Sequence, residues 1–205
     1  MHSPMSTTNL STRKDEIRKA AHAARKAQPD KDAVSSLITD RVQALDAYQA
    51  AKTVMYYVDV REEVRTRQAL PQAIQSDKRI IIPYCVDGEL ELFWLQSMDE
   101  LEEGAYRILE PKAELREVAE KKIAVEALEL ILVPGVAFDK LGGRTGHGKG
   151  YYDKLLEHAK LTTPLVALAF ECQMFAEIPM QAHDIYMDLV VTEKATYQGR
   201  GRNTK

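Results

Sequence analysis

The sequence predicts an α/β protein: a mostly parallel sheet flanked by helices on both faces, in a three-layer α/β/α, doubly wound arrangement. Three observations lead to this fold class. Short apolar runs are nearly continuous, which is typical of strands buried on both faces. Segments with helical spacing separate these runs. The chain has 205 residues, of which 45% are hydrophobic, and this size suits one domain with a sizeable core.

Two helices are predicted before the first strand. Thr12 and Asp15 have the spacing of a helix-opening cap, and good helix formers then run over residues 13–28. Apolar residues recur at three- and four-residue spacing over residues 34–48, which indicates an amphipathic second helix. Residues 1–10 lack such a pattern, and residues 199–205 are basic and contain glycine. We therefore expect a flexible leader, a single domain over residues 11–198, and a flexible basic tail over residues 199–205.

The remaining elements alternate along the chain. Helices are expected over residues 64–74 and 151–159. Strands are expected over residues 53–58, 79–83, 89–95, 128–133, 164–170 and 187–191, with an Asp-Gly turn signal between the second and the third. Parallel sheets of this kind bind ligands beyond the carboxyl ends of their strands. Functional residues are therefore sought directly after each strand.

Composition excludes several function classes. Lys and Arg number 28 against 31 Asp and Glu, so the net charge is −3 and basic excess for nucleic-acid binding is lacking. No apolar run is long enough to span a bilayer, and the first residues are polar where a signal peptide is apolar. Cys85 and Cys172 fit neither a disulfide framework nor a zinc motif. We expect a cytoplasmic protein that binds neither nucleic acid nor membrane.

The strongest motif is a glycine-rich loop over residues 142–150, which contains five of the ten glycines. Glycines let backbone N–H groups approach a ligand, so a loop of this kind before a helix suits phosphate. Arg144 and Lys149 add positive charge for a phosphate group. A standard Walker A loop is disfavoured, because Gly150 stands where Ser or Thr would hold Mg²⁺. The alternative is a surface loop with incidental cations.

Carboxylates near this loop are candidate metal ligands. Asp153 is in the first turn of the following helix, and Asp188 is in the last apolar strand, where an unpaired carboxylate is costly to bury. A lone Asp in a first helical turn, such as Asp153, is more often a cap that stabilises the helix dipole, and the alternative for Asp188 is a structural hydrogen-bond acceptor. Asp139 is a weaker candidate, because Asp in a turn usually bonds its own backbone.

Other segments offer groups for a substrate. Lys14, Arg18 and Arg25 form a basic stripe on the first helix, which suits either a phosphate clamp or a solvated helix face. Glu63 follows the first strand and is either a substrate contact or a helix cap. Tyr106 lies in an extended segment and either stacks on a flat heterocycle or fills the core. Among the histidines, only His147 lies inside the glycine-rich loop.

Taken together, these residues resemble the 5-formyltetrahydrofolate cyclo-ligase family. The segments VPGVAFD at 133–139 and RTGHGKGYYD at 144–153 match the family signature PGxxFD…GxRLGxGxGYYD. Lys14 and Arg18 match its KxxxR motif, and further matches lie at residues 63–66, 108–111 and 188–193. Two residues depart from the pattern. Arg65 replaces an acidic residue, and Thr145 replaces a leucine.

The resemblance implies a complete set of roles. It implies Mg²⁺ at Asp153 and Asp188, and Arg144 and Lys149 as the catalytic cations that stabilise the transferred phosphoryl group. ATP as co-substrate is implied at Lys14, Arg18, Arg144, Thr145, Gly146, His147, Gly148, Lys149, Gly150, Tyr151 and Tyr152. The folate substrate is implied at Val58, Glu63, Tyr106, His147, Gly148, Lys149, Gly150 and Tyr151.

The implied reaction converts 5-formyltetrahydrofolate and ATP to 5,10-methenyltetrahydrofolate, ADP and phosphate. It proceeds through phosphorylation of the formyl oxygen and ring closure by N10, with the protein supplying alignment and charge neutralisation. Two alternatives remain open: a nucleotide- or phosphate-binding regulatory module without turnover, and a phosphosugar isomerase-like enzyme. We expect a monomer, with a weak dimer as the alternative.

Overall fold

The computed structural model describes residues 7–104 and 108–202 of the chain. Its main feature is a seven-stranded sheet with the strand order β12-β11-β9-β6-β1-β2-β3. The strands are β1 (Thr53–Met55), β2 (Arg79–Val86), β3 (Glu89–Leu95), β6 (Leu130–Val133), β9 (Leu165–Leu168), β11 (Leu189–Val191) and β12 (Thr196–Gln198). The five central strands are parallel, and the edge strands β3 and β12 are antiparallel to their neighbours. The predicted α/β class with a mostly parallel sheet is confirmed.

The order of the strands creates a switch point between β1 and β6. From β1 the chain crosses to β2 on one side, whereas β6 on the other side is followed outward by β9 and β11. Loops leaving the carboxyl ends of β1 and β6 therefore diverge. In open α/β sheets this divergence opens the crevice in which ligands bind.

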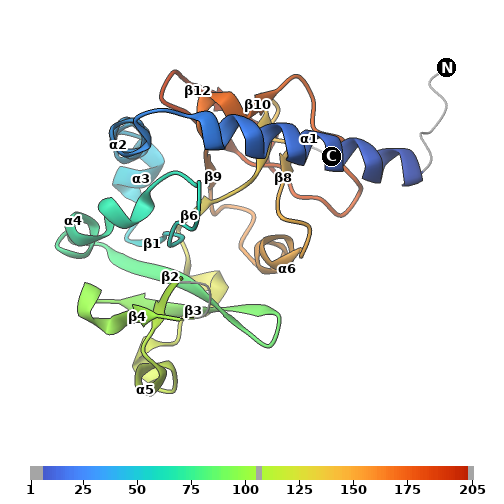
Figure 1. Cartoon of the computed structure of the whole chain (residues 1–205). Helices are drawn as coiled ribbons and strands as arrows, with labels where there is room; N and C mark the ends of the chain where they lie inside the picture. Colours follow the sequence, from blue (N-terminus) through green and yellow to red (C-terminus); the bar gives the residue numbers. More distant parts are fainter. Residues whose placement is uncertain (1–6, 105–107, 203–205) are drawn as a thin grey trace.

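Alternate residues of each central strand face opposite layers. Val54, Ile80 and Leu132 belong to one hydrophobic core, and Met55 and Ile81 belong to the other. The first core is covered by α2 (Lys31–Gln43), α3 (Asp46–Ala50) and α4 (Leu70–Ile74). These helices gather at the left of Figure 1, and α6 (Tyr151–Glu157) lies apart from them, below α1. Continuous apolar strands thus have both faces covered.

The second core is covered by α6 and by a small three-stranded sheet that the sequence analysis did not predict. Its strands are β10 (Met174–Phe175), β7 (Ala137–Asp139) and β8 (Arg144–Thr145). Helix α1 (Thr7–Ala27) packs its Ala21 against Val136 and Ala137 on this sheet. Strands of two or three residues carry no readable periodicity, so only tertiary pairing reveals them.

Beyond β3 the chain forms a hairpin of β4 (Leu101–Glu103) and β5 (Leu109–Pro111), followed by the short helix α5 (Ala113–Arg116). The predicted turn at Asp87-Gly88 is confirmed, because φ is 47° and 84° at these two residues and both positive values suit a two-residue hairpin. Several element boundaries differ from the prediction. Helix α1 begins at Thr7, and the predicted second helix divides into α2 and α3 at the extended residue Leu45.

The segment predicted as helix 64–74 is a 3₁₀ turn (Thr66–Gln68) followed by α4. The Thr66 hydroxyl donates to the backbone oxygen of Tyr57 (2.5 Å), which holds this turn against the strand segment before it. Side chains that bond nearby backbone groups compete with regular helix in this way. No described helix has an apolar stretch long enough to cross a bilayer.

Residues 199–202, which fall in the predicted basic tail, are hydrogen-bonded to the rest of the fold. The backbone N–H groups of Gly199 and Arg200 donate to the oxygens of Asp188 and Leu141, at 2.8 Å each. The Arg202 guanidinium donates to the backbone oxygens of four residues around the end of α6: Leu156, Ala159, Lys160 and Thr163. Carbonyl groups at a helix end lack partners within the helix, so this arginine is a tertiary cap.

Candidate active site

Several of the sequence-predicted residues lie near the carboxyl ends of β1 and β6, at the switch point. Val58 and Glu63 lie in the segment after β1, and the glycine-rich loop, which contains β8, follows β7 after β6. Helix α1 crosses beside β8 and β10 (Figure 1). It brings the residues of its basic stripe to this edge of the sheet. Three segments that are far apart in the chain thus form one site.

The glycines of the loop have two different roles. Gly142 and Gly143 are packed, since an added Cβ would lie 2.2 Å from the Met187 oxygen and 2.5 Å from the Asp139 carboxylate. Gly148 and Gly150 adopt φ of 89° and 71°, and a Cβ added there would meet only the Arg18 guanidinium at Gly148 and open space at Gly150. Positive φ favours glycine, so these two shape the exposed part of the loop. The part of the loop that is accessible to a ligand is therefore residues 146–150.

Arg144 lies in β8 and is buried, with its side chain only 5% exposed. Its Nη2 donates to Oδ1 of Asp153 (2.6 Å), and its Nη1 donates to the Pro134 oxygen (3.3 Å). The guanidinium also lies 6.0 Å from the ring centre of Tyr152. Thr145, the second departure from the family pattern, is buried beside it. Arg144 is thus held rigidly at the end of β6, beside the start of α6.

Arg25 is the most buried cation of the site, at 1% exposure. Its Nη1 donates to the Gly135 oxygen (3.2 Å). Arg144 and Arg25 therefore donate to two successive carbonyl oxygens, those of Pro134 and Gly135, after the carboxyl end of β6. Burial lowers the pKa of Arg25, and the charge of Glu63 partly offsets this. The basic stripe of α1 is therefore not a solvated helix face.

Glu63 is a buried carboxylate facing this cluster. Its Oε2 accepts a hydrogen bond from the Val60 N–H (3.0 Å), and its Oε1 lies 3.8 Å from Nε2 of His147. Burial first, and then the charge of Glu63, raise the pKa of Tyr152. The alternative role of Glu63 as a helix cap is wrong, because its carboxylate closes its own turn after β1. Val58 lies half-buried against the core on the same segment.

His22 belongs to the site, although sequence reasoning assigned it no function. Its ring centre is 5.4 Å from that of His147, and its Nδ1 lies 3.3 Å from Nη2 of Arg25. Burial is the main cause that lowers the pKa of His22, with the positive charge of Arg25 second. The available signal was its position on α1: residues 14, 18, 22 and 25 share one helix face.

The outer cations of the site are already paired. Nζ of Lys14 lies 2.5 Å from Oδ2 of Asp184, and Arg18 pairs with Asp15 at the same distance. Nε of Arg18 also donates to the Gly146 oxygen (2.9 Å), which ties α1 to the loop. Lys149 is exposed and lies 5.6 Å from the ring centre of Tyr151. It forms no ion pair with any described residue.

The structure does not bring Asp153 and Asp188 together. Asp153 starts α6 and pairs with Arg144, near the carboxyl end of β6. Asp188 precedes β11, and its Oδ2 accepts from the Leu165 N–H (2.8 Å) at the amino end of β9. The described residues contain no cluster of three or more metal-binding side chains. Asp139 accepts from the backbone of Leu141, Gly143 and Ile178, as expected for a turn. Tyr106 lies outside the described residues.

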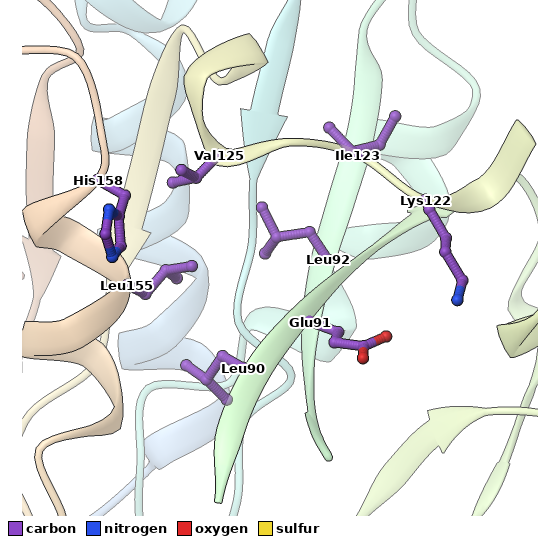
Figure 2. A pocket seen from close by; sticks show the side chains of 8 residues that line it. All are labelled: Leu90, Glu91, Leu92, Lys122, Ile123, Val125, Leu155 and His158. Atoms are coloured by element: carbon purple, nitrogen blue, oxygen red, sulfur yellow. The ribbon is translucent and has the colours of Figure 1, made fainter. Parts of the chain in front are cut away.

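Two pockets lie on the surface of the described residues. One, of about 520 Å³, is lined by polar residues of the segment after β1 and the start of α2: Asp32, Asp59, Arg61, Arg65, Arg67 and Gln68. The other, of about 360 Å³, lies between β3 and α6. Figure 2 shows Leu90, Leu92, Val125 and Leu155 on its α6 side, with Glu91 and Lys122 pointing away. This apolar pocket lacks the cations and glycines of the switch point.

The fold and the site together define a class: an α/β protein whose glycine-rich loop and convergent cations form a site for a phosphorylated ligand at the topological switch point. A sequence model of the 5-formyltetrahydrofolate cyclo-ligase family matches residues 10–193. The chain belongs to this family.

Relatives and solved structures agree with this assignment. The 5-formyltetrahydrofolate cyclo-ligase of Mus musculus is 32% identical over 168 residues, which cover 78% of this chain and 82% of that protein. The structure of 5,10-methenyltetrahydrofolate synthetase from Aquifex aeolicus superposes with a TM-score of 0.78 at 32% identity, covering 94% of this chain and 96% of that one. The Mycoplasma pneumoniae synthetase shares the fold, with a TM-score of 0.69 at 20% identity over 88% of this chain and 98% of that one.

Proposed function

We propose that this chain is an enzyme that converts 5-formyltetrahydrofolate to 5,10-methenyltetrahydrofolate with consumption of ATP. The observation that carries the proposal is the family match over residues 10–193, together with the convergence of the signature loop and the α1 cations at the switch point. The relatives named above carry the same activity in their names.

The chemistry explains why such a site needs cations. A formyl amide on N5 is a poor electrophile, so direct attack by N10 would have to expel hydroxide or water. Transfer of the γ-phosphoryl group to the formyl oxygen replaces this leaving group with phosphate. N10 then attacks the formyl carbon and loses its proton, the carbon–oxygen bond to phosphate breaks, and the ring closes. The products are methenyltetrahydrofolate, ADP and phosphate, and the protein supplies alignment and charge neutralisation.

The nucleotide side of the site is supported by the loop and by α1. Arg18 bonds the Gly146 oxygen, Lys149 lies within the loop, and Lys14 lies one turn before Arg18 on α1. These three cations would neutralise the phosphates. Arg144, gripped by Pro134 and Asp153, is preorganised to stabilise charge on the transferred group. The carboxylate partners of Lys14 and Arg18 must yield to phosphate oxygens. ATP binding is therefore expected to weaken as salt rises.

Mg²⁺ bound with ATP would neutralise phosphate charge and orient the γ-phosphoryl group. Carboxylate oxygens are the ligands that Mg²⁺ prefers. Of the two predicted ligands, Asp153 fits better, because it is partly exposed beside the loop and its Oδ2 accepts no hydrogen bond from any described residue. Asp188 already serves the backbone of β9.

The folate side is proposed to lie against the segment after β1. Val58 supplies apolar surface, and Glu63 orients the pterin or N10 side through the carboxylate oxygen that faces His147. The loop residues His147 to Tyr151 then lie between the two substrates. Tyr106 remains a proposed contact outside the described residues. A cytoplasmic location and a monomeric state also remain proposals.

Absorbance of the conjugated methenyl product tests this function. Purified protein is mixed with 5-formyltetrahydrofolate, with and without MgATP, and the near-ultraviolet band of the product is followed. Product only with MgATP is the expected result. ATP binding by calorimetry without any turnover would instead indicate a regulatory module. Turnover of a sugar phosphate without ATP would indicate an isomerase, and no binding of ATP or ADP with magnesium would end the proposal.

A further inference from the structure

Three arginines surround the polar pocket beside the segment after β1. Arg61 and Arg65 lie on the turn that carries Glu63, and Arg67 follows in the 3₁₀ turn. The side chains of Arg65 and Arg67 are 22% and 40% exposed, and Arg61 is exposed. Arginines gathered in a concave surface are a typical binding site for carboxylate or phosphate groups.

A buried carboxylate holds this pocket in shape. The Asp59 side chain is fully buried and accepts from the backbone N–H of Arg67 (2.8 Å) and from its Nε (3.2 Å). Arg65 Nη1 lies 3.7 Å from the same carboxylate and donates to the Arg61 oxygen. Asp59 therefore fixes the direction of two guanidinium groups without using all of their donors. Preorganised donors bind a ligand at a smaller entropic cost.

The pocket keeps donors in excess. Asp59 is satisfied internally, and Asp32 is 75% exposed and lies 3.7 Å from Arg65 Nε. The Arg61 side chain has no hydrogen bond or ion pair to any described residue. Its backbone adopts a φ of 53°, a left-handed conformation that is unfavourable for arginine. The pocket therefore offers positive charge that the described residues do not neutralise.

The position of the arginine pocket indicates which kind of anion it binds. The pocket shares the β1 segment with Val58 and Glu63, on the proposed folate side, whereas the phosphate-side cations come from α1, β8 and the glycine-rich loop. The charge of Arg61 contributes to lowering the pKa of His22, so Arg61 lies close to the site cluster. Folate ends in a glutamyl tail that carries carboxylates. The family pattern has an acidic residue where this chain has Arg65, so this position carries a positive instead of a negative charge.

From this placement we infer that Arg61, Arg65 and Arg67 bind the carboxylates of the glutamyl tail of the folate substrate. The inference rests on the proposed function and adds a subsite to it. The pterin lies toward Glu63 and His147, and the tail runs outward along the β1 segment to the arginine pocket. Bidentate pairing of a guanidinium with a carboxylate supplies the recognition.

The test compares two substrates and four proteins. 5-Formyltetrahydrofolate is compared with its tail-less analogue 5-formyltetrahydropteroate, in the wild type, Arg61→Asn, Arg65→Gln and the control Lys160→Gln. Asn suits the left-handed backbone at residue 61, so Arg61→Asn removes the charge without adding strain. Lys160 is exposed beyond α6, and its replacement gives the same change in net charge away from the pocket. Thermal unfolding of each variant checks the fold.

Each arginine substitution is expected to raise KM for 5-formyltetrahydrofolate by roughly fivefold. The KM for ATP and the KM for the tail-less analogue are expected to stay within about twofold of the wild type, as are all constants of Lys160→Gln. An unchanged KM for 5-formyltetrahydrofolate in Arg61→Asn overturns the inference, and so does an equal rise for the tail-less analogue. A rise in KM for ATP alone would assign the pocket to phosphate. Because wild-type turnover is measured in the same assay, the proposed function stands or falls separately.

Discussion

The two ends of the parallel strands use the same chemical groups in opposite ways. At the carboxyl end, Arg144 and Asp153 form a pair beside the glycine-rich loop, with an exposed lysine and an uncommitted carboxylate oxygen nearby. At the amino end, Asp188 accepts a hydrogen bond from the backbone of β9, and Arg202 donates to backbone oxygens at the end of α6. Both ends hold an aspartate and an arginine, but only at the carboxyl end do these residues lie beside groups that a ligand can contact.

The difference arises from where unsatisfied backbone groups occur. At the amino end, the N–H of Leu165 and the carbonyls at the end of α6 require partners, and Asp188 and Arg202 supply them. At the carboxyl end, Lys149 forms no ion pair with any described residue, and Oδ2 of Asp153 accepts no hydrogen bond from one. A charged residue therefore indicates function only when the local backbone does not already account for it.

The largest expected effect is at the carboxyl end. Arg144→Ala removes a preorganised cation from the transferred phosphoryl group and is expected to lower kcat by about 10² to 10³. Steady-state kinetics with saturating MgATP measures this. Thermal unfolding must accompany it, because Asp153 loses its buried partner. A kcat within a few-fold of the wild type would remove Arg144 from catalysis.

Substitution of the two aspartates tests their separation directly. Asp188→Asn leaves the Leu165 N–H with a weaker acceptor and is expected to lower the free energy of unfolding by about 1 to 3 kcal/mol, with the Mg²⁺ dependence of activity unchanged. Asp153→Asn is expected to raise the Mg²⁺ concentration needed for half-maximal rate. Urea unfolding and Mg²⁺ titrations of activity measure both. A shift in the Mg²⁺ dependence of activity in Asp188→Asn would support the original prediction that Asp153 and Asp188 share one metal ion.

Arg202→Ala tests the packed C-terminal segment. The variant leaves four carbonyl oxygens around the end of α6 without this donor and is expected to lose about 2 kcal/mol of stability. The kcat at low temperature is expected to stay that of the wild type, since Arg202 lies at the amino end. Wild-type stability in this variant would mean that the segment behaves as the flexible tail that composition indicates.

The smallest expected effect is the pH dependence of His22. Its folded pKa lies below the ordinary value, mainly through burial. The unfolded chain therefore binds this proton first as pH falls, and stability decreases below about pH 6.5 until the folded pKa is passed. Protonation of Nδ1 also removes its hydrogen bond with Arg25. NMR titration of the ring and unfolding curves of His22→Gln measure the effect. A folded pKa at or above 6.5 contradicts it.

Local pattern was sufficient for much of the fold. Apolar runs such as Leu130–Val133 and Leu165–Leu168 predict strands because burial on both faces removes any polar alternation. The Asp87-Gly88 turn follows from the positive φ that only a few residues adopt readily. The glycine-rich loop and the resemblance to the family are recognised from the spacing of residues within short segments of the chain. These features depend on neighbours in the chain, which the sequence displays directly.

Tertiary structure alone decided the partners of the charged residues. Lys14 pairs with Asp184, 170 positions away, and Arg18 reaches Gly146 across 128. Nothing local distinguishes Asp153, beside the loop, from Asp188, bound to β9, because each outcome depends on which backbone groups another segment leaves unpaired. The sequence determined which groups this protein carries. Their division between structure and function was decided by the packing of distant segments, because hydrogen bonds and charge pairs act over a few ångströms of space whatever the distance along the chain.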